Sequence, residues 1–222
     1  MTNTPSAIRT VLFDLDGTLA DTAPDLAYAL NLLRRQHGMA DMPFEEIRPA
    51  ASHGSIALLK VGFQSAPGDE GFEELRTAYL DLYEANINTH TTLFPGMAEI
   101  LDEIEARQLN WGVVTNKPAW LTEPLLEALG IRQRAACVIS GDSLPERKPH
   151  PAPLLHACQL AGSQAAECIY IGDAERDIVA GHAAGMTTLI AMFGYLSEAD
   201  QPDNWPADGR IQQPGEILDW LD

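Results

Sequence analysis

The chain has 222 residues and a formal net charge of −18, from 32 acidic and 14 basic residues. This charge argues against a nucleic-acid partner, which needs a basic protein face, and against an anionic membrane surface. The 45% hydrophobic content is ordinary for a globular protein, and no apolar stretch is long enough to span a bilayer. The start, MTNTPSAIRT, shows no signal-peptide pattern, and the odd number of cysteines (Cys137, Cys158, Cys168) predicts reduced thiols in a cytoplasmic protein.

The first predicted strand is VLFD, residues 11–14, and it runs into a group of acids. Residues 22–91 then show helical periodicity and no strand pattern; PDLAYALNLLRRQHG, for example, places three leucines on one helical face. We therefore predict an all-helical cap over residues 22–91, inserted after the first strand. A helical module beside the end of a strand is well placed to act as a lid.

From about residue 96 the pattern alternates between amphipathic helices and short apolar strands. The predicted strands are WGVVTN, AACVIS, CIYIGD and TTLIAMF, and a helical pattern precedes or separates each of them. Continuous apolar strands between helices are typical of a parallel sheet covered on both faces. The predicted fold is therefore an α/β core, residues 1–21 and 92–222, that carries the smaller helical cap.

Polar side chains follow four of the predicted strands at the point where each strand ends. They are Asp14 and Asp16, Thr115 and Asn116, Lys148, and Asp173 and Asp177. Each segment alone could be a turn or a helix cap. In a parallel sheet, however, the carboxyl ends of the strands meet at one edge, where ligands bind. We therefore expect these side chains to share one site.

Several carboxylates at one sheet edge are best explained by a hard divalent cation such as Mg²⁺, which prefers oxygen ligands. Asp14 and Asp173 are the natural direct ligands. Asp177 lies one helical turn beyond Asp173, where it can hold either a metal-bound water or Lys148. The charges of these three acids, Mg²⁺ and Lys148 balance to zero, so such a site could accept a phosphate despite the acidic background.

Asp14 and Asp16 are two residues apart, so in an extended chain their side chains leave the same face. One carboxylate can attack phosphorus and form an aspartyl phosphate, while the other transfers the proton. Gly17 allows a tight turn and Thr18 offers a hydroxyl to lock it. Thr115, Asn116 and Lys148, with backbone N–H groups of the turn, would bind the phosphate oxygens.

The stretches FDLDGTLAD, VVTNKP, RKPHP and GDAERD, in that order, resemble the four motifs of the haloacid dehalogenase-like hydrolases. The resemblance implies a Rossmann-like core with a helical cap inserted after the first strand. It implies that Asp14 is the nucleophile, Asp16 the acid/base and Thr115 a phosphate ligand, and that Lys148 steadies nucleophile and phosphate. It also implies that Asp14, Asp173 and the backbone carbonyl of Asp16 bind Mg²⁺, with Asp177 in support.

Within that superfamily the chain resembles the phosphoglycolate phosphatase-like branch. GVVTNKP and the tail from residue 193 look closer to N-acetylmuramic acid 6-phosphate phosphatases. The implied function is a Mg²⁺-dependent phosphatase acting on a small phosphorylated metabolite, with 2-phosphoglycolate or N-acetylmuramate 6-phosphate as leading substrates.

The cap departs from the phosphoglycolate enzymes, which tend to carry a glycine-x-glycine after an arginine. Here the stretch is RPAASHGSIALL, with Ser52 and His53 before Gly54. His53 either faces the substrate or lies on the cap surface. Arg48 either binds a substrate carboxylate or ends a helix.

Three other functions are open to a chain with this pattern. Dehalogenases of the superfamily generally lack the second acid of the first motif, so Asp16 argues against that activity. A phosphomutase also passes through an aspartyl phosphate, but its cap must hold a bisphosphate and exclude water. A non-catalytic sensor of phosphorylated ligands would be expected to have lost Asp14 or Asp16.

Overall fold

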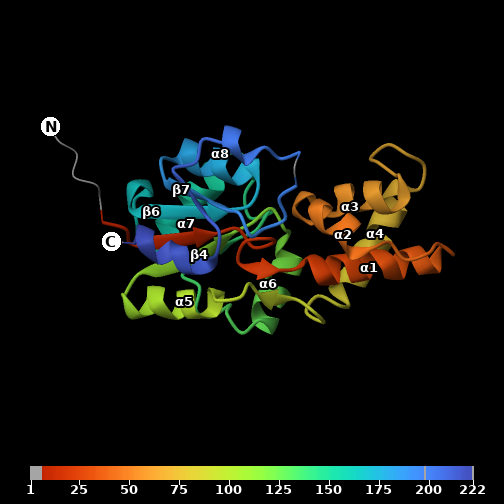
Figure 1. Ribbon diagram of the computed structural model, residues 1–222, viewed down its shortest axis with the longest axis horizontal. Coiled ribbons are helices and arrows are strands. Elements are labelled where there is room, and N and C mark those ends of the chain that lie inside the picture. Colours follow the sequence, from red (N-terminus) through yellow and green to blue (C-terminus); the bar gives the residue numbers. More distant parts are fainter. Residues whose placement is uncertain (1–6, 198, 222) are drawn as a thin grey trace.

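The computed structural model describes residues 7–197 and 199–221, and its main feature is a six-stranded, wholly parallel sheet (Figure 1). The central strand β1 (Thr10–Phe13) lies between β4 (Asn110–Val114) and β6 (Cys168–Gly172). The strand β5 (Cys137–Ile139) forms one edge, and β7 (Thr187–Ala191) followed by β8 (Gly209–Ile211) forms the other. The carboxyl ends of all six strands therefore point in one direction.

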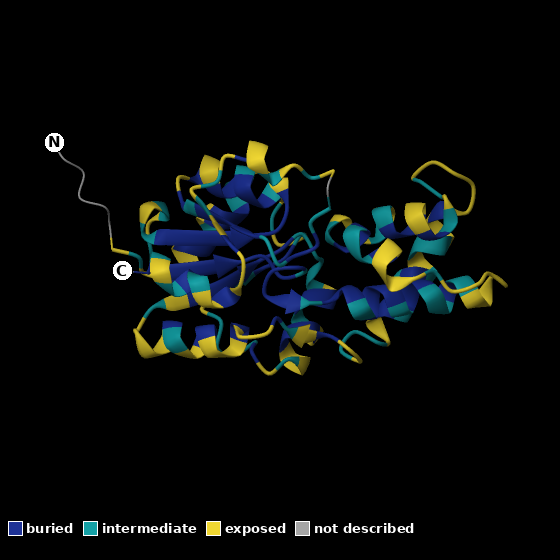
Figure 2. Cartoon of the chain, viewed as in Figure 1, coloured by how far each residue is buried: buried dark blue, intermediate teal, exposed yellow. Residues whose placement is uncertain are grey.

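The strand β1 is buried on both faces, which is why its sequence is a continuous apolar run rather than an alternating one. Val11 and Phe13 join a core cluster that includes residues of α5 (Met97–Ala106) and α6 (Ala119–Ala128). Leu12 joins a second cluster with residues of α7 (Ala152–Ala161) and α8 (Glu175–Ala184). Figure 2 shows the result, with buried strands between helices whose outer faces are exposed.

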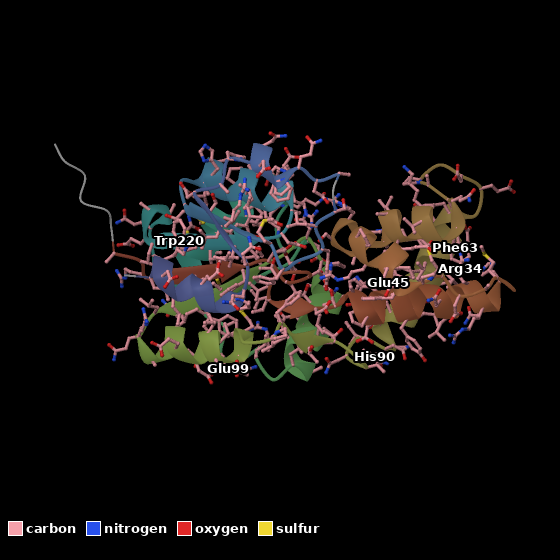
Figure 3. The ribbon with its side chains drawn as sticks, in the orientation of Figure 1. Arg34, Glu45, Phe63, His90, Glu99 and Trp220 are labelled. Carbon is pink, nitrogen blue, oxygen red and sulfur yellow. The ribbon has the colours of Figure 1, made fainter. Side chains whose placement is uncertain are left out.

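A helical cap lies beyond the carboxyl end of β1 (Figure 1). It contains α1 (Ala23–Gln36), α2 (Phe44–Ile47), α3 (Gly54–Phe63) and α4 (Phe72–Glu84), with a 3₁₀ segment over Arg48–His53. The helices α1 and α4 pack together, and the buried Tyr79 hydroxyl donates to the carbonyl of Leu26 at 3.2 Å. At the outer end, near Phe63, Arg34 donates to the carbonyl of Gly62 and so ties α1 to α3 (Figure 3).

Two short contacts hold the linkers between cap and core. The strands β2 (Ala20–Asp21) and β3 (Thr92–Leu93) pair antiparallel where the chain enters and leaves the cap. Asp25 of α1 is fully buried, and it accepts hydrogen bonds from the backbone N–H groups of His90 and Thr91 at 2.8–2.9 Å. The returning chain is therefore fixed to the first helix of the cap.

The predicted α/β class is confirmed: a parallel core carries a helical cap inserted after the first strand. Two features were not predicted, namely the edge strand β8 and the β2–β3 pair, because segments of two or three residues carry no periodic signal. The predicted boundaries of the cap, at residues 22 and 91, stay a prediction. Residues 1–6 of the predicted core lie outside the described part of the chain. In that described part, no helix is both long and apolar enough to cross a bilayer.

Candidate active site

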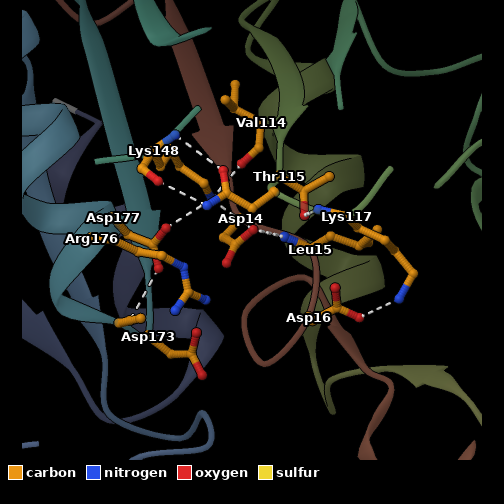
Figure 4. A network of polar contacts seen from close by, with 12 residues as sticks. Asp14, Leu15, Asp16, Val114, Thr115, Lys117, Lys148, Asp173, Arg176 and Asp177 are labelled. Carbon is orange, nitrogen blue, oxygen red and sulfur yellow. Dashed lines mark hydrogen bonds and ion pairs between the residues drawn. The ribbon is translucent and has the colours of Figure 1, made fainter. Parts of the chain in front are cut away.

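Asp14 comes directly after β1 and stands at the centre of a network of polar contacts (Figure 4). Its backbone N–H donates to the carbonyl of Ile171 at 2.8 Å, which continues the sheet pairing with β6 by one residue. Its Oδ1 accepts hydrogen bonds from the backbone N–H of Leu15 and from Lys148 Nζ, each at 2.8 Å. Its Oδ2 has no hydrogen-bond partner among the described residues, so one oxygen of a fixed carboxylate is free.

Lys148 is only 2% exposed, and its ammonium group is enclosed by acceptors. Besides Asp14, Nζ lies 2.7 Å from Asp177 Oδ1, 2.8 Å from the carbonyl of Val114 and 2.7 Å from the Tyr170 hydroxyl. A buried ammonium is tolerated only when it is paired and hydrogen-bonded. The lysine therefore joins the ends of β1, β4 and β6 to the first turn of α8.

Asp14, Asp173 and Asp177 form a buried acidic triad in which one oxygen from each lies within 4.8 Å of the others. Asp173 Oδ2 accepts hydrogen bonds from the backbone N–H of Tyr195 at 2.8 Å and from Ser52 Oγ of the cap at 2.7 Å. Asp173 Oδ1 is buried without any hydrogen-bond partner in the described structure. A buried carboxylate oxygen without a partner is costly, and a cation would satisfy it.

The pKa shifts within the acidic triad also favour a bound cation. Burial alone would raise the pKa of Asp14, but the charges of Lys148 and Arg176 hold it below its ordinary value. Burial, with the nearby charges of Asp14 and Asp177, raises the pKa of Asp173 to about 7. Asp14 is thus kept ionised, whereas Asp173 lacks the positive charge that would keep it so.

The turn after Asp14 requires glycine at position 17. Gly17 has φ +84°, and a Cβ built there would lie 2.2 Å from Asp173 Oδ2. The backbone closes the turn, with Gly17 N–H donating to the carbonyl of Ala20 at 3.0 Å. The expectation that the Thr18 hydroxyl locks the turn is wrong, because this hydroxyl is buried and has no hydrogen-bond partner among the described residues.

The side chain of Asp16 lies on the cap side of the turn. Its Oδ1 accepts a hydrogen bond from the Thr22 hydroxyl at 2.6 Å and pairs with Lys117 Nζ at 2.8 Å. Lys117 Nζ also donates to the Tyr83 hydroxyl of α4 at 2.8 Å. Asp16 is therefore held by groups from the cap linker, the core and, through Lys117, the cap itself.

A cavity of about 500 Å³ separates cap and core above this site. Asp14, Asp16 and Thr115 line it from the core, and residues of α3 and α4 line it from the cap. Its volume is within the usual range for small-molecule sites.

The sequence model of the family described as "Haloacid dehalogenase-like hydrolase" matches residues 11–191, which is most of the chain. The chain belongs to this family of hydrolases. Among relatives of this hydrolase, a protein of Xanthomonas campestris pv. campestris named phosphoglycolate phosphatase is 43% identical over 209 residues, with 94% of each chain covered. A protein of Pseudomonas putida named N-acetylmuramic acid 6-phosphate phosphatase is 39% identical over 215 residues, covering 97% of this chain and 96% of its own.

A crystal structure described as a predicted phosphoglycolate phosphatase from Haemophilus somnus superposes on this hydrolase with a TM-score of 0.85. The identity is 26%, and the match covers 98% of this chain and 99% of the other. The expected family is confirmed, as is the enzyme class, a phosphoric monoester hydrolase.

The structure of the hydrolase brings together the acids and the lysine that the sequence singled out, and it also places Thr115 and Asn116 in the cavity lining. The Thr115 hydroxyl accepts a hydrogen bond from the backbone N–H of Lys117 at 3.1 Å. The Asn116 amide binds both backbone groups of Lys148, at 2.9 and 3.1 Å. This contact favours a positioning role for Asn116 over the expected contact with phosphate.

The structure places the two candidate cap residues, His53 and Arg48, in different surroundings. His53 lines the cavity, with its ring Nε2 3.8 Å from Asp200 Oδ1. Arg48 is not among the lining residues; its guanidinium lies 4.9 Å from the centre of the Tyr195 ring and donates to the carbonyl of Phe193 at 3.4 Å. The expectation that Arg48 binds a substrate carboxylate is therefore not supported, because the 3₁₀ segment turns this side chain toward the core.

Sequence reasoning missed three residues of the hydrolase site: Lys117, Arg176 and Tyr195. Lys117 and Arg176 stand inside the quoted motifs VVTNKP and GDAERD, so their positions were a signal that was not used. Arg176 Nη2 donates to the carbonyl of Ser52 at 2.6 Å and lies beside the triad (Figure 4). Tyr195 carried no local signal, because its contacts join segments far apart in the sequence.

Proposed function

We propose that the chain is a Mg²⁺-dependent phosphomonoesterase that works through an aspartyl-phosphate intermediate on Asp14. The observation that carries this proposal is the carboxylate of Asp14, which is ionised, fixed through Oδ1 and free at Oδ2. This is the arrangement that a carboxylate nucleophile needs, since its orientation is set before the substrate arrives.

The residues fit a divalent metal. Asp14, Asp173 and the backbone carbonyl of Asp16 would hold it, and the partnerless Oδ1 of Asp173 supports this assignment. Hard oxygen donors of this kind favour Mg²⁺. When bound, the ion would neutralise charge on the carboxylates and on a phosphate group.

The reaction follows from the roles of the side chains. Asp14 Oδ2 attacks phosphorus, the bond from phosphorus to the ester oxygen breaks, and Asp16 gives a proton to the leaving alkoxide. Asp16 then takes a proton from water, whose oxygen attacks the aspartyl phosphate at phosphorus and releases inorganic phosphate and Asp14. The Thr115 hydroxyl binds a phosphate oxygen during both transfers, while Lys148 holds Asp14 in place and supplies positive charge beside it.

Relatives named for phosphoglycolate and for N-acetylmuramic acid 6-phosphate support a small phosphate monoester as substrate. The test is phosphate release from 2-phosphoglycolate, N-acetylmuramate 6-phosphate and common hexose phosphates, with Mg²⁺ and with a chelator. We expect hydrolysis of at least one ester that stops in chelator and returns with Mg²⁺. Full activity in chelator would refute the metal assignment.

Asp14→Asn should abolish release, by at least about 10³-fold, because an amide is a poor nucleophile. Asp203→Asn is the matched control, since this exposed acid lies outside the cavity and pairs with Arg210. It should retain the parent rate. Appreciable turnover by Asp14→Asn would refute the nucleophile assignment.

A further inference from the structure

The cavity holds an unusual share of the positive charge of this acidic protein. The chain has only 14 lysines and arginines, yet four of them, Arg76, Lys117, Arg147 and Arg176, line this one cavity. Lys117 is committed to Asp16, and Arg176 lies beside the triad and donates to the carbonyl of Ser52. The other two cations serve neither the nucleophile nor the acid/base.

Arg147 and Arg76 are available to a ligand. The side chain of Arg147 is exposed and makes no hydrogen bond or ion pair with the described residues. Arg76 donates to Ser55 Oγ at 3.2 Å and lies 3.5 Å from the exposed Glu73 carboxylate. Such exposed pairs contribute little, so a better placed anion can replace them. The nearby Asp142 accepts a hydrogen bond from the backbone N–H of Ala119 and forms no ion pair with Arg147 in the described structure.

These two guanidinium groups come from opposite walls. Arg147 stands in the core loop before Lys148, and Arg76 stands on α4 of the cap. The planar fork of a guanidinium matches a carboxylate or a phosphate. Because Asp14 and Lys148 are 2% exposed whereas Arg147 is exposed, the second cationic region lies shallower than the reacting phosphate.

The same cavity has apolar walls on both sides. Trp120 of the core is 43% exposed and Ile56 of the cap is 46% exposed, and both line the cavity. Sites for small molecules are lined mainly by apolar and aromatic side chains, so these two side chains suit contact with a ligand. A volume of about 500 Å³ is far larger than a two-carbon phosphate ester requires, and it suits a ring-sized substrate.

We propose that Arg147 and Arg76 form a second anion site, so that the substrate is a hexose-sized phosphate monoester carrying a carboxylate remote from its phosphate. Trp120 contacts the apolar face of the sugar ring between the two anionic ends. This inference rests on the proposed phosphatase function and narrows its substrate class, against two-carbon acids and uncharged hexose phosphates.

Two sugar phosphates that differ only in a lactyl ether, which bears the carboxylate, test the inference. N-acetylmuramate 6-phosphate and N-acetylglucosamine 6-phosphate share ring, acetamido group and phosphate, but only the first carries a lactyl carboxylate. We expect kcat/KM to favour the first by about 10- to 100-fold, the range for one charge-assisted hydrogen-bonded contact. 2-Phosphoglycolate should be a poorer substrate than the first sugar phosphate.

Arg147→Gln and Arg76→Gln should each reduce this preference by at least about fivefold, and Arg147→Lys should restore part of it. The matched control is Lys60→Gln, which removes an exposed cap charge outside the cavity and should keep the preference. Thermal unfolding of each variant confirms that the fold is intact. The measured ratio of two substrates is insensitive to partial loss of active protein.

The possible results of these measurements bear on the second anion site and on the phosphatase function separately. Equal rates on the two sugar phosphates, or a preference that survives both glutamine variants, overturns the second anion site. Rapid hydrolysis of 2-phosphoglycolate alone overturns it too, while the phosphatase function stands. No hydrolysis of any ester would instead overturn the proposed function on which the inference rests.

Discussion

Single residues of the site are constrained by their neighbours to a degree that local sequence does not reveal. Gly17 is needed twice, for its positive φ and for the close approach of Asp173. Gly130 has a similar φ of +72°, but a Cβ there would meet nothing within 4 Å. Comparing substitutions at these two glycines therefore separates the effect of backbone strain, present at both, from that of contact with Asp173, present at Gly17 alone.

We expect Gly130→Ala to lower the free energy of unfolding by about 1–2 kcal/mol, the penalty of the left-handed conformation, and to leave activity unchanged. Gly17→Ala should lose more stability and at least about tenfold in kcat, because Asp173 must move. Urea unfolding and phosphate release measure the two effects. Equal activity in both variants would contradict the crowding argument.

The raised pKa of Asp173 makes the stability of the metal-free protein depend on pH. Its pKa of about 7 lies above the ordinary 3.8. Between these two pH values the folded protein therefore holds a proton that the unfolded chain has lost. The contribution of this group is fully present below the ordinary pKa and is lost as the pH rises toward about 7.

In chelator, the free energy of unfolding should therefore fall between about pH 4 and pH 7 more steeply in the parent protein than in Asp173→Asn. Added Mg²⁺ should stabilise the parent most at the upper end of this range, because only the ionised carboxylate binds metal. Parallel pH profiles of the two proteins would argue that Asp173 titrates normally.

At the scale of elements, the helices could be predicted from their apolar periodicity and the central strands from their continuous apolar runs, because both patterns reflect burial. The edge strand β8 could not, since three residues at a sheet edge carry no such record. The contact between Asp25 and the returning linker was also beyond prediction, because it joins residues 65 and 66 positions apart. Asp25 and Asp41 in the cap now offer a matched pair, one buried and one exposed.

Asp25→Ala should lower the free energy of unfolding by roughly 2–4 kcal/mol, because it leaves the buried donors of Thr91 and the partly buried N–H of His90 without a partner. Asp41→Ala removes the exposed pair with Arg35 and should change stability very little. Urea unfolding of both variants checks this, and similar losses would show that Asp25 does not anchor the linker.

At the scale of the whole molecule, Tyr195 connects the cap and its linker to Asp173, the proposed metal ligand. Its hydroxyl accepts a hydrogen bond from Ala23 N–H at 2.9 Å and donates to Asp21 at 2.8 Å, while its backbone N–H binds Asp173. Sequence order predicted that four motifs converge on one sheet edge. It could not predict this connection or the contact between Lys117 and Tyr83, because neither belongs to a single element.

Tyr195→Phe should speed amide exchange at residues 21–23 and raise KM, because the linker loses its attachment to the core while the ring stays beneath Arg48. Tyr28→Phe is the control, since the Tyr28 hydroxyl has no hydrogen-bond partner in the described part of the chain and its ring packs on His90. Exchange mass spectrometry of the two variants should differ at the linker, and identical patterns would contradict the assignment.

The central claim is that Asp14 becomes phosphorylated during turnover. Borohydride added to the enzyme during steady-state hydrolysis of an accepted phosphate ester reduces an aspartyl phosphate to homoserine, and peptide mass spectrometry locates it. The account predicts homoserine at position 14, dependent on substrate and on Mg²⁺. Rapid turnover with Asp14 unmodified, or homoserine at another aspartate, would contradict it.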